Sequence, residues 1–480
     1  MQLYNTLSRQ LEAFQPSDGI TLGLYVCGPT VYDYLHIGNV RPIIVFDAFR
    51  RYVSGFHGWK TIYVQNITDV DDKLIDRANR TGESVDDVAS RFTEAYFGLL
   101  DRLGVLLPDH SPKATEHIDE MIDLIERLVA REAAYEAGGD VYFAVDALPE
   151  YGQLSGRQLD EQEAGARVEA STLKRNPLDF TLWKAAKPGE PSWPSPWGEG
   201  RPGWHTECVV MSRKYLGRRL DIHAGGNDLI FPHHENEIAQ ARAAFDEPFF
   251  RVWLHNGMLS FQGEKMSKSL GNFAYAQDVV DRYGARTVRY FYLSRHYRKP
   301  LDYSEEGLQA AQVAVGRIET LVSDINGEQI RPASGNQPPG AEVDSFLQRL
   351  DALRDKYITA MEDDFNTVGA IGVLQEIVGE TNRFRTDARD TDRAALLPAV
   401  ELVRELSSPL GILSEGDSRC MDAGEATESE LVALLLELRS TLREQKLFAL
   451  SDEIRDRLDA LGIVLKDTPQ GTLWRKKPND

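Results

Sequence analysis

The first strand–turn–helix pattern of the chain lies in residues 20–39, ITLGLYVCGPTVYDYLHIGN. The apolar run 20–26 predicts a strand, Gly28 and the proline after it end that strand, and the apolar spacing that follows predicts a helix. A helix N-terminus in this position binds anions, because its unpaired N–H groups and its dipole face the ligand. His36 can add a donor, and Gly38 lets a nucleotide approach the backbone closely. The segment therefore predicts a phosphate site; a turn with an incidental histidine is the alternative.

A second short segment, Lys265-Met266-Ser267-Lys268-Ser269, lies between glycines and predicts a loop that carries two ammonium groups. Point charges on flexible side chains suit a pyrophosphate leaving group, whose negative charge grows in the transition state. A solvated basic loop is the alternative. Together with the strand–turn–helix pattern, this segment indicates a site that binds ATP and transfers an adenylyl group.

The two motifs together resemble the signature sequences of class I aminoacyl-tRNA synthetases, a His-Ile-Gly-His type tetrapeptide and a Lys-Met-Ser-Lys-Ser loop. This chain has Asn39 where that class often has a second histidine, and an amide can still donate a hydrogen bond. The resemblance implies that the catalytic residues are His36, Asn39, Lys265 and Lys268. It implies that the ATP-binding residues are Gly38, His36, Asp228 and Lys268. For Asp228, which follows a predicted strand, an acidic helix cap is the alternative.

Residues that can ligate a metal occur in three separate segments. Cys27 follows the first predicted strand, and Cys208 follows a Gly-Trp-His-Thr-Glu sequence. His233 and Glu237 lie four residues apart at the start of a predicted helix, so both project from one face and can hold one ion. Two thiolates, an imidazole and a carboxylate favour zinc. His234 is a competing ligand that shares this face, and buried free cysteines without a metal are the alternative.

These positions are similar to the zinc ligands of cysteinyl-tRNA synthetases, the family within class I that the chain resembles. The resemblance implies one Zn²⁺ per subunit with the ligands Cys27, Cys208, His233 and Glu237. It implies L-cysteine as the substrate, because zinc binds a thiolate directly, whereas a steric pocket separates near-isosteres such as serine by only about 1 to 3 kcal/mol. The residues implied to contact this amino acid are Thr30, Thr68 and Trp204. For Trp204, a buried structural tryptophan is the alternative.

The resemblance also implies a reaction in two steps. ATP with Mg²⁺ activates L-cysteine to cysteinyl-adenylate, and a terminal ribose hydroxyl of tRNA(Cys) then attacks the adenylate carbonyl. Neither step needs a protein nucleophile, so orientation and charge stabilisation would supply most of the acceleration. We expect the tRNA to contact the protein through its acceptor end and its anticodon.

The length of 480 residues exceeds what one hydrophobic core supports and predicts several domains. Predicted strands near 20–27, 61–68 and 217–224 alternate with helical patterns, which indicates an α/β fold with a parallel sheet. The resemblance identifies a Rossmann-type catalytic domain with a connective insertion, followed by an α-helical bundle and a small C-terminal anticodon-binding domain. The predicted bounds are 1–111 and 201–303 for the catalytic halves, 112–200 for the insertion, 304–413 for the bundle and 428–480 for the last domain.

The charge of the chain is acidic, with 54 Lys and Arg against 75 Asp and Glu and a formal net charge of −21. Local patches rather than net charge bind nucleic acid, so this balance does not exclude a tRNA partner. One basic patch, which we call the arginine cluster, consists of Arg286, Arg289, Arg295, Arg298 and Lys299. A solvated face is the alternative for it.

Three cysteines in the chain argue against a disulfide framework and for a reducing compartment. The sequence has no run of about 18 apolar residues and no signal-peptide pattern, so we expect a cytoplasmic protein with no membrane partner. A cysteine ligase that acts on an amino sugar would keep the zinc ligands and both motifs, but it would leave the helical C-terminal part without a purpose. A non-catalytic RNA-binding relative would be expected to lose signature lysines or zinc ligands, and all are present.

Overall fold

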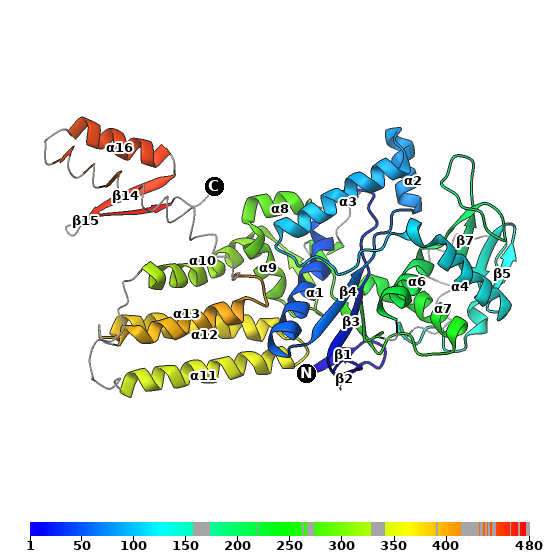
Figure 1. The fold of residues 1–480 in the computed structure, drawn as a ribbon, viewed down its shortest axis with the longest axis horizontal. Helices are drawn as coiled ribbons and strands as arrows, with labels where there is room; N and C mark the ends of the chain where they lie inside the picture. Colours follow the sequence, from blue (N-terminus) through cyan, green and yellow to red (C-terminus); the bar gives the residue numbers. More distant parts are fainter. Residues whose placement is uncertain are drawn as a thin grey trace. The chain divides into compact units, whose positions relative to one another are not determined.

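The computed structural model describes residues 1–156, 173–217, 219–261, 264–265, 273–327, 341–389 and 392–413, together with parts of 432–476. The chain forms two compact units, Met1–Ile412 and Leu413–Asp480, and each is described separately here (Figure 1). The finer division of the first unit at residues 111, 200 and 303 stays a prediction.

A four-stranded parallel sheet in the order β10-β9-β3-β4 lies at the centre of the first unit. Its strands are β3 (Thr21–Val26), β4 (Lys60–Gln65), β9 (Ile222–Gly226) and β10 (Val252–Asn256). Five of the six residues of β3 are buried, because a parallel sheet is covered on both faces. The predicted α/β fold class with a parallel sheet is confirmed.

Helices of the first half connect and cover this sheet. They are α1 (Ile37–Phe56), α2 (Asp72–Thr81) and α3 (Val85–Arg102). Local sequence sets their ends: the Asp71 side chain accepts a hydrogen bond from the Lys73 N–H at 2.9 Å, and the Ser84 hydroxyl accepts one from the Asp87 N–H at 3.0 Å. Helix α2 ends at Gly82 in the left-handed conformation, with φ 71°.

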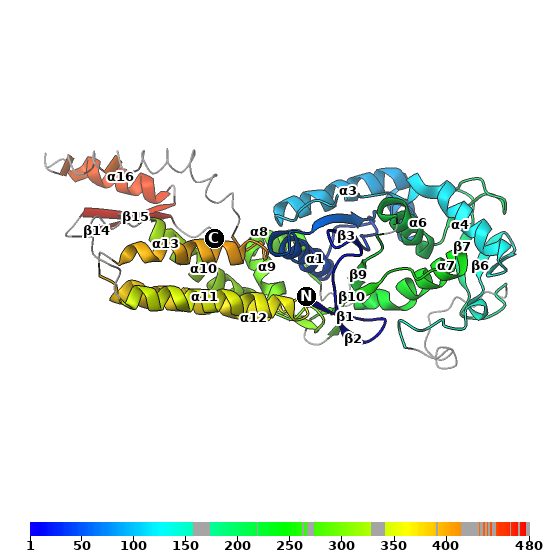
Figure 2. The same ribbon diagram turned by 60° about the horizontal axis from the view of Figure 1, so that its bottom comes forward.

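A second sheet, antiparallel and in the order β5-β6-β7-β8, interrupts the parallel one in sequence. Its strands are β5 (Ala134–Ala137), β6 (Asp140–Phe143), β7 (Phe180–Ala185) and β8 (Gly200–Pro202). The helices nearby are α4 (Ile118–Ala130), α6 (Trp204–Leu216) and α7 (Glu235–Phe245). Figures 1 and 2 place these strands beside α4, at the end of the first unit that is remote from α11 and α12.

The chain after β10 forms a small sheet and then a helical bundle. The short strands are β11 (Leu259–Phe261), β12 (Glu264–Lys265) and β13 (Leu301–Tyr303), with an N-terminal hairpin of β1 (Gln2–Asn5) and β2 (Gln10–Ala13) elsewhere. The helices are α8 (Ala276–Tyr283), α9 (Ala285–Leu293), α10 (Glu305–Gly327), α11 (Ala341–Glu362), α12 (Thr367–Asp387) and α13 (Leu396–Ser407). Helices α10 to α13 lie side by side (Figures 1 and 2), and Phe346 stacks on Phe384 between α11 and α12 at 4.1 Å. The predicted helical bundle is confirmed.

The second unit contains α16 (Phe448–Ala460) and a hairpin of β14 (Ile463–Thr468) and β15 (Gly471–Lys476). Leu458 and Ile463 are buried in its small core, and Trp474 packs against them. In the described part of the chain, no helix is both long and apolar enough to cross a bilayer.

Candidate active site and metal centre

A cleft of about 340 Å³, which we call the central cleft, opens at the carboxyl ends of the parallel strands. This is where open α/β sheets bind their ligands. Of the residues that the sequence predicted, those that line it are Cys27, Thr30, His36, Gly38, Asn39, Trp204 and Asp228. The structure therefore brings together residues that are far apart in the chain.

The turn after β3 approaches its neighbour so closely that a side chain has no room. A Cβ on Gly28 would lie 1.6 Å from the Asn66 carbonyl oxygen, and the Gly28 N–H donates to the Asn66 side-chain oxygen at 2.8 Å. This contact fixes the backbone next to Cys27. The glycine is thus required for close approach rather than for an unusual dihedral angle.

The N-terminus of α1 forms one wall of the central cleft. His36 is its N-cap residue, and the Asn39 side-chain oxygen accepts a hydrogen bond from the His36 N–H at 3.3 Å. An asparagine carries a donor as well as an acceptor, so its NH₂ group can still donate to a ligand. The departure from a second histidine therefore keeps a donor and adds a cap.

The four predicted ligands converge beside the cleft, where Cys27 reaches its surface and the other three are buried. Their ligand atoms lie within 4.8 Å of one another, and the residues are Cys27, Cys208, His233 and Glu237. The two sulfurs are 3.8 Å apart, His233 Nε2 lies 3.6 Å from the Cys208 sulfur, and His233 Nε2 lies 3.1 Å from Glu237 Oε1. Both described cysteines are free thiols. Such a group can hold a metal ion.

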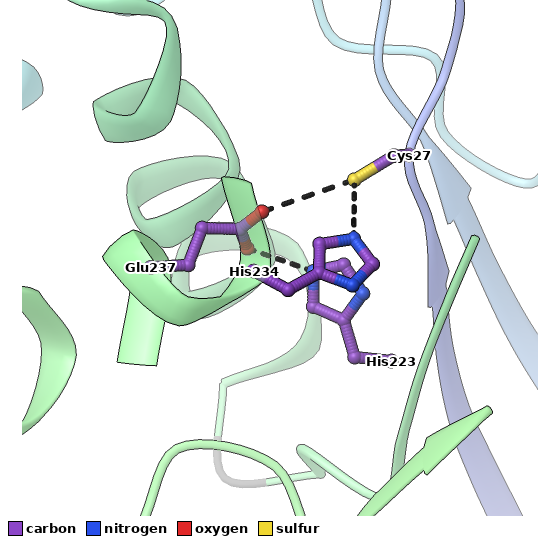
Figure 3. A group of neighbouring side chains, drawn as sticks. All are labelled: Cys27, His223, His234 and Glu237. Atoms are coloured by element: carbon purple, nitrogen blue, oxygen red, sulfur yellow. Dashed lines mark hydrogen bonds and ion pairs between the residues drawn. The ribbon is translucent and has the colours of Figure 1, made fainter. Parts of the chain in front are cut away.

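A second group overlaps the first and includes the competing histidine. It consists of Cys27, His223, His234 and Glu237, which Figure 3 shows converging from the end of β3, from β9 and from the start of α7. His234 Nε2 lies 3.2 Å from the Cys27 sulfur, and His223 Nε2 lies 2.8 Å from Glu237 Oε2. Both groups contain Cys27 and Glu237. Two ions therefore cannot fill the two groups at the same time.

The far ring nitrogens of these histidines differ in their partners. His233 Nδ1 lies 2.9 Å from His205 Nδ1, and His234 Nδ1 lies 2.8 Å from His255 Nε2. The Nδ1 atom of His223 is buried and has no hydrogen-bond partner among the described residues. Metal-bound histidines nearly always hydrogen-bond through the second nitrogen, and only the second group contains one that lacks this bond.

Burial shifts the titration of the whole group towards neutral forms. Burial, with the neighbouring Cys208 thiol, raises the pKa of Cys27 well above its usual value, and burial raises that of Glu237 in the same way. Burial and the nearby His205 and His223 rings lower the pKa of His233 well below its usual value. Several buried acids and bases without a counter-charge are the arrangement that a bound cation would compensate.

Trp204 is a wall of the cleft rather than a buried structural residue. It is the first residue of α6, it is 39% exposed, and its ring stacks on the His233 ring at 4.1 Å.

Asp228 is exposed in the short turn Asn227–Leu229 after β9. The N-cap of this turn is Gly226, so Asp228 is not a helix N-cap.

The expectation that Thr68 lines the cleft is not met. Its side chain is 1% exposed, and its hydroxyl donates to Glu207 at 2.7 Å. Thr68 pairs with Thr30 through an isolated β-bridge, and only Thr30 reaches the cleft surface. Since α6 brings Glu207 over the end of β4, the carboxylate takes the hydroxyl away from the cleft.

The signature lysines are only partly described. The backbone of Lys265 lies in β12, and Lys268 lies outside the described residues. The predicted helix around His233 begins later than the sequence indicated, because α7 starts at Glu235 and the backbone at Phe231 before it is not helical, with φ −138° and ψ 132°. His233 and Glu237 nevertheless meet, as the distance above shows.

Three histidines that carried no prediction lie around Cys27, Cys208, His233 and Glu237, which we call the metal group. They are His223 and His255, which are buried, and His205, which is half-buried. Burial lowers the pKa of His205 to about 4 and the pKa values of His223 and His255 to about 3. A single histidine on a strand, as His223 on β9 and His255 on β10, or in the first turn of a helix, as His205 on α6, gives no local signal of a metal site.

Within the arginine cluster, Arg289 is buried and the other four residues are partly or fully exposed. Arg289 is buried and donates to Asp47, Arg298 Nε lies 2.6 Å from Asp364 Oδ2, and Arg286 Nη1 lies 2.6 Å from Glu319 Oε1. Arg295 and Lys299 are exposed. Three of the five residues are thus paired with carboxylates, while four of the five reach the solvent, which agrees with the alternative of a solvated face.

Comparisons with known proteins agree with this geometry. The model of the class I (C) tRNA synthetase catalytic domain matches residues 13–313, and the DALR domain model matches residues 356–414. A Mycobacterium tuberculosis methionyl-tRNA synthetase in complex with methionyl-adenylate has the same fold, with a TM-score of 0.64 and 15% identity over 82% of this chain and 91% of that one. Fold and central cleft thus define a class I aminoacyl-tRNA synthetase.

Relatives at higher identity define the family within this class. The cysteine–tRNA ligase of Caldicellulosiruptor saccharolyticus is 48% identical over 472 residues, 98% of this chain and 99% of the relative. That of Heliobacterium modesticaldum is 46% identical over 483 residues, 99% of both chains. The chain belongs to the cysteine–tRNA ligase family.

Proposed function

We propose that the protein activates L-cysteine with ATP and transfers it to the 3′ end of tRNA(Cys). The observation that carries this proposal is the group of two thiols, an imidazole and a carboxylate beside a cleft whose wall is the N-terminus of α1. The first feature suits a thiol substrate, and the second suits a nucleotide.

We propose Zn²⁺ as the resident metal, held by Cys27, Cys208, His233 and Glu237. The set has four donors, the number that a tetrahedral zinc site needs, and its two thiolates are soft ligands that suit zinc. The contact of His233 with His205 supplies the outer hydrogen bond that such a ligand needs. In this arrangement His234 and His223 act as outer partners, next to the Cys27 sulfur and Glu237 Oε2 respectively. When bound, zinc would coordinate the substrate thiolate and so distinguish cysteine from serine.

The nucleotide would lie over the N-terminus of α1. There His36 and Asn39 donate hydrogen bonds to phosphate oxygens, and Gly38 permits close approach of the backbone. Asp228, exposed at the end of β9, accepts from the ribose hydroxyls, and Mg²⁺ accompanies the ATP. We assign charge stabilisation of the departing pyrophosphate to Lys265 and Lys268.

The amino acid would lie between Trp204 and the turn after β3. The stacking of Trp204 on His233 places an aromatic surface beside the metal group, where it excludes water from the substrate. Thr30 lines the same part of the cleft. No protein nucleophile is needed, because the cysteine carboxylate attacks the α-phosphate and the tRNA hydroxyl attacks the adenylate carbonyl.

We assign anticodon contacts to the C-terminal part of the chain, residues 304–413 and 428–480. The DALR domain model matches residues 356–414 within this part, and the curated relatives align with nearly the whole chain. A ligase that joins cysteine to an amino sugar would have no use for these helices. The tRNA is therefore the acceptor that we propose.

The experiment that tests this proposal measures pyrophosphate exchange with cysteine and with serine, followed by charging of bulk tRNA. We expect exchange with cysteine only, one zinc per chain, and charging of tRNA(Cys). A Lys268→Ala variant should lose about 100- to 1,000-fold in exchange, as loss of a preorganised charge does. The matched control is Lys214→Ala, since Lys214 pairs with Glu120 on the surface. Equal activation of serine, or unchanged exchange by Lys268→Ala, would refute the respective assignment.

A further inference from the structure

A buried arginine lies one turn into α1, directly behind the wall of the central cleft. Arg41 is 0% exposed and donates four hydrogen bonds, all to backbone carbonyls. Nη1 lies 2.7 Å from the Gly257 oxygen and 3.1 Å from the Met258 oxygen. Nη2 lies 2.7 Å from the Lys299 oxygen and 3.2 Å from the His296 oxygen. The guanidinium therefore joins two separate chain segments to the helix that carries His36.

The bonding of Arg41 is unusual for a buried cation. No carboxylate pairs with it in the part of the chain that the structure describes, whereas the equally buried Arg289 donates to Asp47. Burial lowers the pKa of Arg41 to about 10, which still leaves it charged at neutral pH. A buried charge that is compensated only by carbonyl dipoles is costly, so its presence calls for a reason beyond stability.

The carbonyls that Arg41 holds belong to the cleft wall and to the loop behind it. Gly257 and Met258 line the central cleft, as do Asn39 and Pro42 on the helix of Arg41 itself. The Gly257 N–H donates to the Tyr297 oxygen at 2.7 Å, and a Cβ on Gly257 would lie 2.4 Å from the Lys299 oxygen. The wall therefore packs closely against the loop 296–299, and the Arg41 guanidinium hydrogen-bonds to both.

We propose that Arg41 is a positioning residue that sets the separation between the N-terminus of α1 and the 257–258 wall, and thereby the affinity for ATP. This inference rests on the proposed function of the cleft. A planar fork with five donors reaches four carbonyls at once, which a lysine with one ammonium group does not. Since the wall and the helix N-terminus face the same nucleotide, a small change in their separation removes contacts from both sides.

The first test is the variant Arg41→Lys, which keeps the charge but loses the fork. We expect KM for ATP in cysteine-dependent pyrophosphate exchange to rise by about 10- to 100-fold, the scale of a displacement of about 1 Å in a binding site. KM for cysteine and the zinc content should stay unchanged, because Cys27 and Cys208 lie outside the contacts of Arg41. Titration calorimetry with ATP alone should show the same loss of affinity.

The matched control is Arg289→Lys, a second buried arginine that bonds to the Leu410 carbonyl and to Asp47 away from the cleft. It should lower the unfolding temperature and leave KM for ATP unchanged. Equal rises of KM for ATP and for cysteine in Arg41→Lys, or a lower unfolding temperature with unchanged KM for ATP, would overturn the inference.

A second variant keeps the inference testable if Arg41→Lys does not fold. Gly257→Ala leaves Arg41 in place and pushes the wall off the Lys299 carbonyl, so it should raise KM for ATP as well. An unchanged KM in that variant overturns the inference. Failure of the proposed function would differ, because the wild-type protein itself would then show no cysteine-dependent exchange.

Discussion

The metal group and the arginine cluster are both gatherings of ionisable side chains, yet they differ in how charge is compensated. In the metal group, Cys27, Cys208 and Glu237 lie together, and burial raises the pKa of each. In the arginine cluster, Arg289 and Arg298 each have a carboxylate partner within the protein. We propose that a bound cation completes the first group, whereas Arg289 and Arg298 are paired within the protein.

This difference separates a functional site from a structural one. Perturbed pKa values occur in both, since burial also lowers the pKa of Arg289 beside Asp47. What distinguishes the metal group is the accumulation of like or neutral ligands without a counter-charge. Spacing in sequence does not show this, because the partners Asp47 and Asp364 lie far from the arginines that they bind.

The largest effect should come from removing one thiol of the metal group. We expect Cys208→Ser to lose stoichiometric zinc and more than about 1,000-fold in cysteine-dependent exchange, well beyond the 10- to 100-fold that loss of an outer partner causes. Elemental analysis and pyrophosphate exchange measure both. The control is Cys420→Ser, which changes the third cysteine and should retain metal and activity. Full zinc content in Cys208→Ser would show that the Cys208 thiol is not needed to hold the cation, and it would contradict the proposed difference between the metal group and the arginine cluster.

A smaller effect, on stability alone, should follow from breaking the buried pair of the arginine cluster. Among the described residues, Arg289→Met leaves the buried Asp47 with Arg51 as its cation, and it should lower the free energy of unfolding by about 3 kcal/mol. Denaturant unfolding measures this, and activity per folded molecule should be kept. The double variant with Asp47→Asn should recover part of the stability. A loss of activity without a loss of stability would place Arg289 in a functional site instead.

A further step down, we expect an outer partner of the metal group to tune metal affinity. His205→Phe keeps an aromatic ring at this position but removes the nitrogen that contacts His233 Nδ1. Zinc affinity should therefore fall by about 10- to 100-fold. Competition with a chelator measures this affinity. The control His117→Phe removes another buried histidine, which contacts Tyr215 at 3.2 Å away from the metal group, and should leave zinc affinity unchanged. Equal affinities in both variants would contradict the assignment of His233 as a ligand.

The smallest effect should come from the exposed edge of the arginine cluster. Arg286 and Glu319 are 40% and 39% exposed, so Arg286→Gln should change the free energy of unfolding by no more than about 1 kcal/mol. KM for tRNA in charging assays should not change. Arg282→Gln, at a similar exposed pair with Glu305, is the matched control. A higher KM for tRNA in Arg286→Gln alone would show that the cluster contacts nucleic acid.

Much of the fold followed from local patterns. The apolar run before Cys27 is β3, the helix expected after it is α1, and the predicted alternation of strands and helices corresponds to the parallel sheet. These elements were predictable because apolar periodicity and glycine breaks act over a few residues. The start of α7 was not predictable in this way, because the non-helical backbone at Phe231 before it leaves no trace in the apolar periodicity.

The metal group was predictable only by residue type. Cysteine, histidine and glutamate are suitable ligands anywhere in a chain, but the sequence left His233 and His234 as alternatives. The structure places each of them in a group that could hold a metal ion, with a ring partner from α6 for His233 and from β10 for His234, and His233 as the ligand stays our proposal. The prediction that Thr68 lines the cleft also depended on residues far apart in the chain. Its hydroxyl donates to Glu207 on α6 instead.

The residue types in the sequence by themselves determined the two signature motifs, the alternation of the sheet and the set of residues that could hold a metal ion. Tertiary structure alone decided which side chains meet beside the cleft. The parallel register pairs His223 of β9 with Tyr25 of β3 and with Trp253 of β10. The carbonyls of Gly257 and Lys299 meet Arg41 through the packing of α1 against the segments that follow β10 and α9. The physical reason is that strand register and helix packing are set by burial over the whole unit, and no short stretch of sequence contains that information.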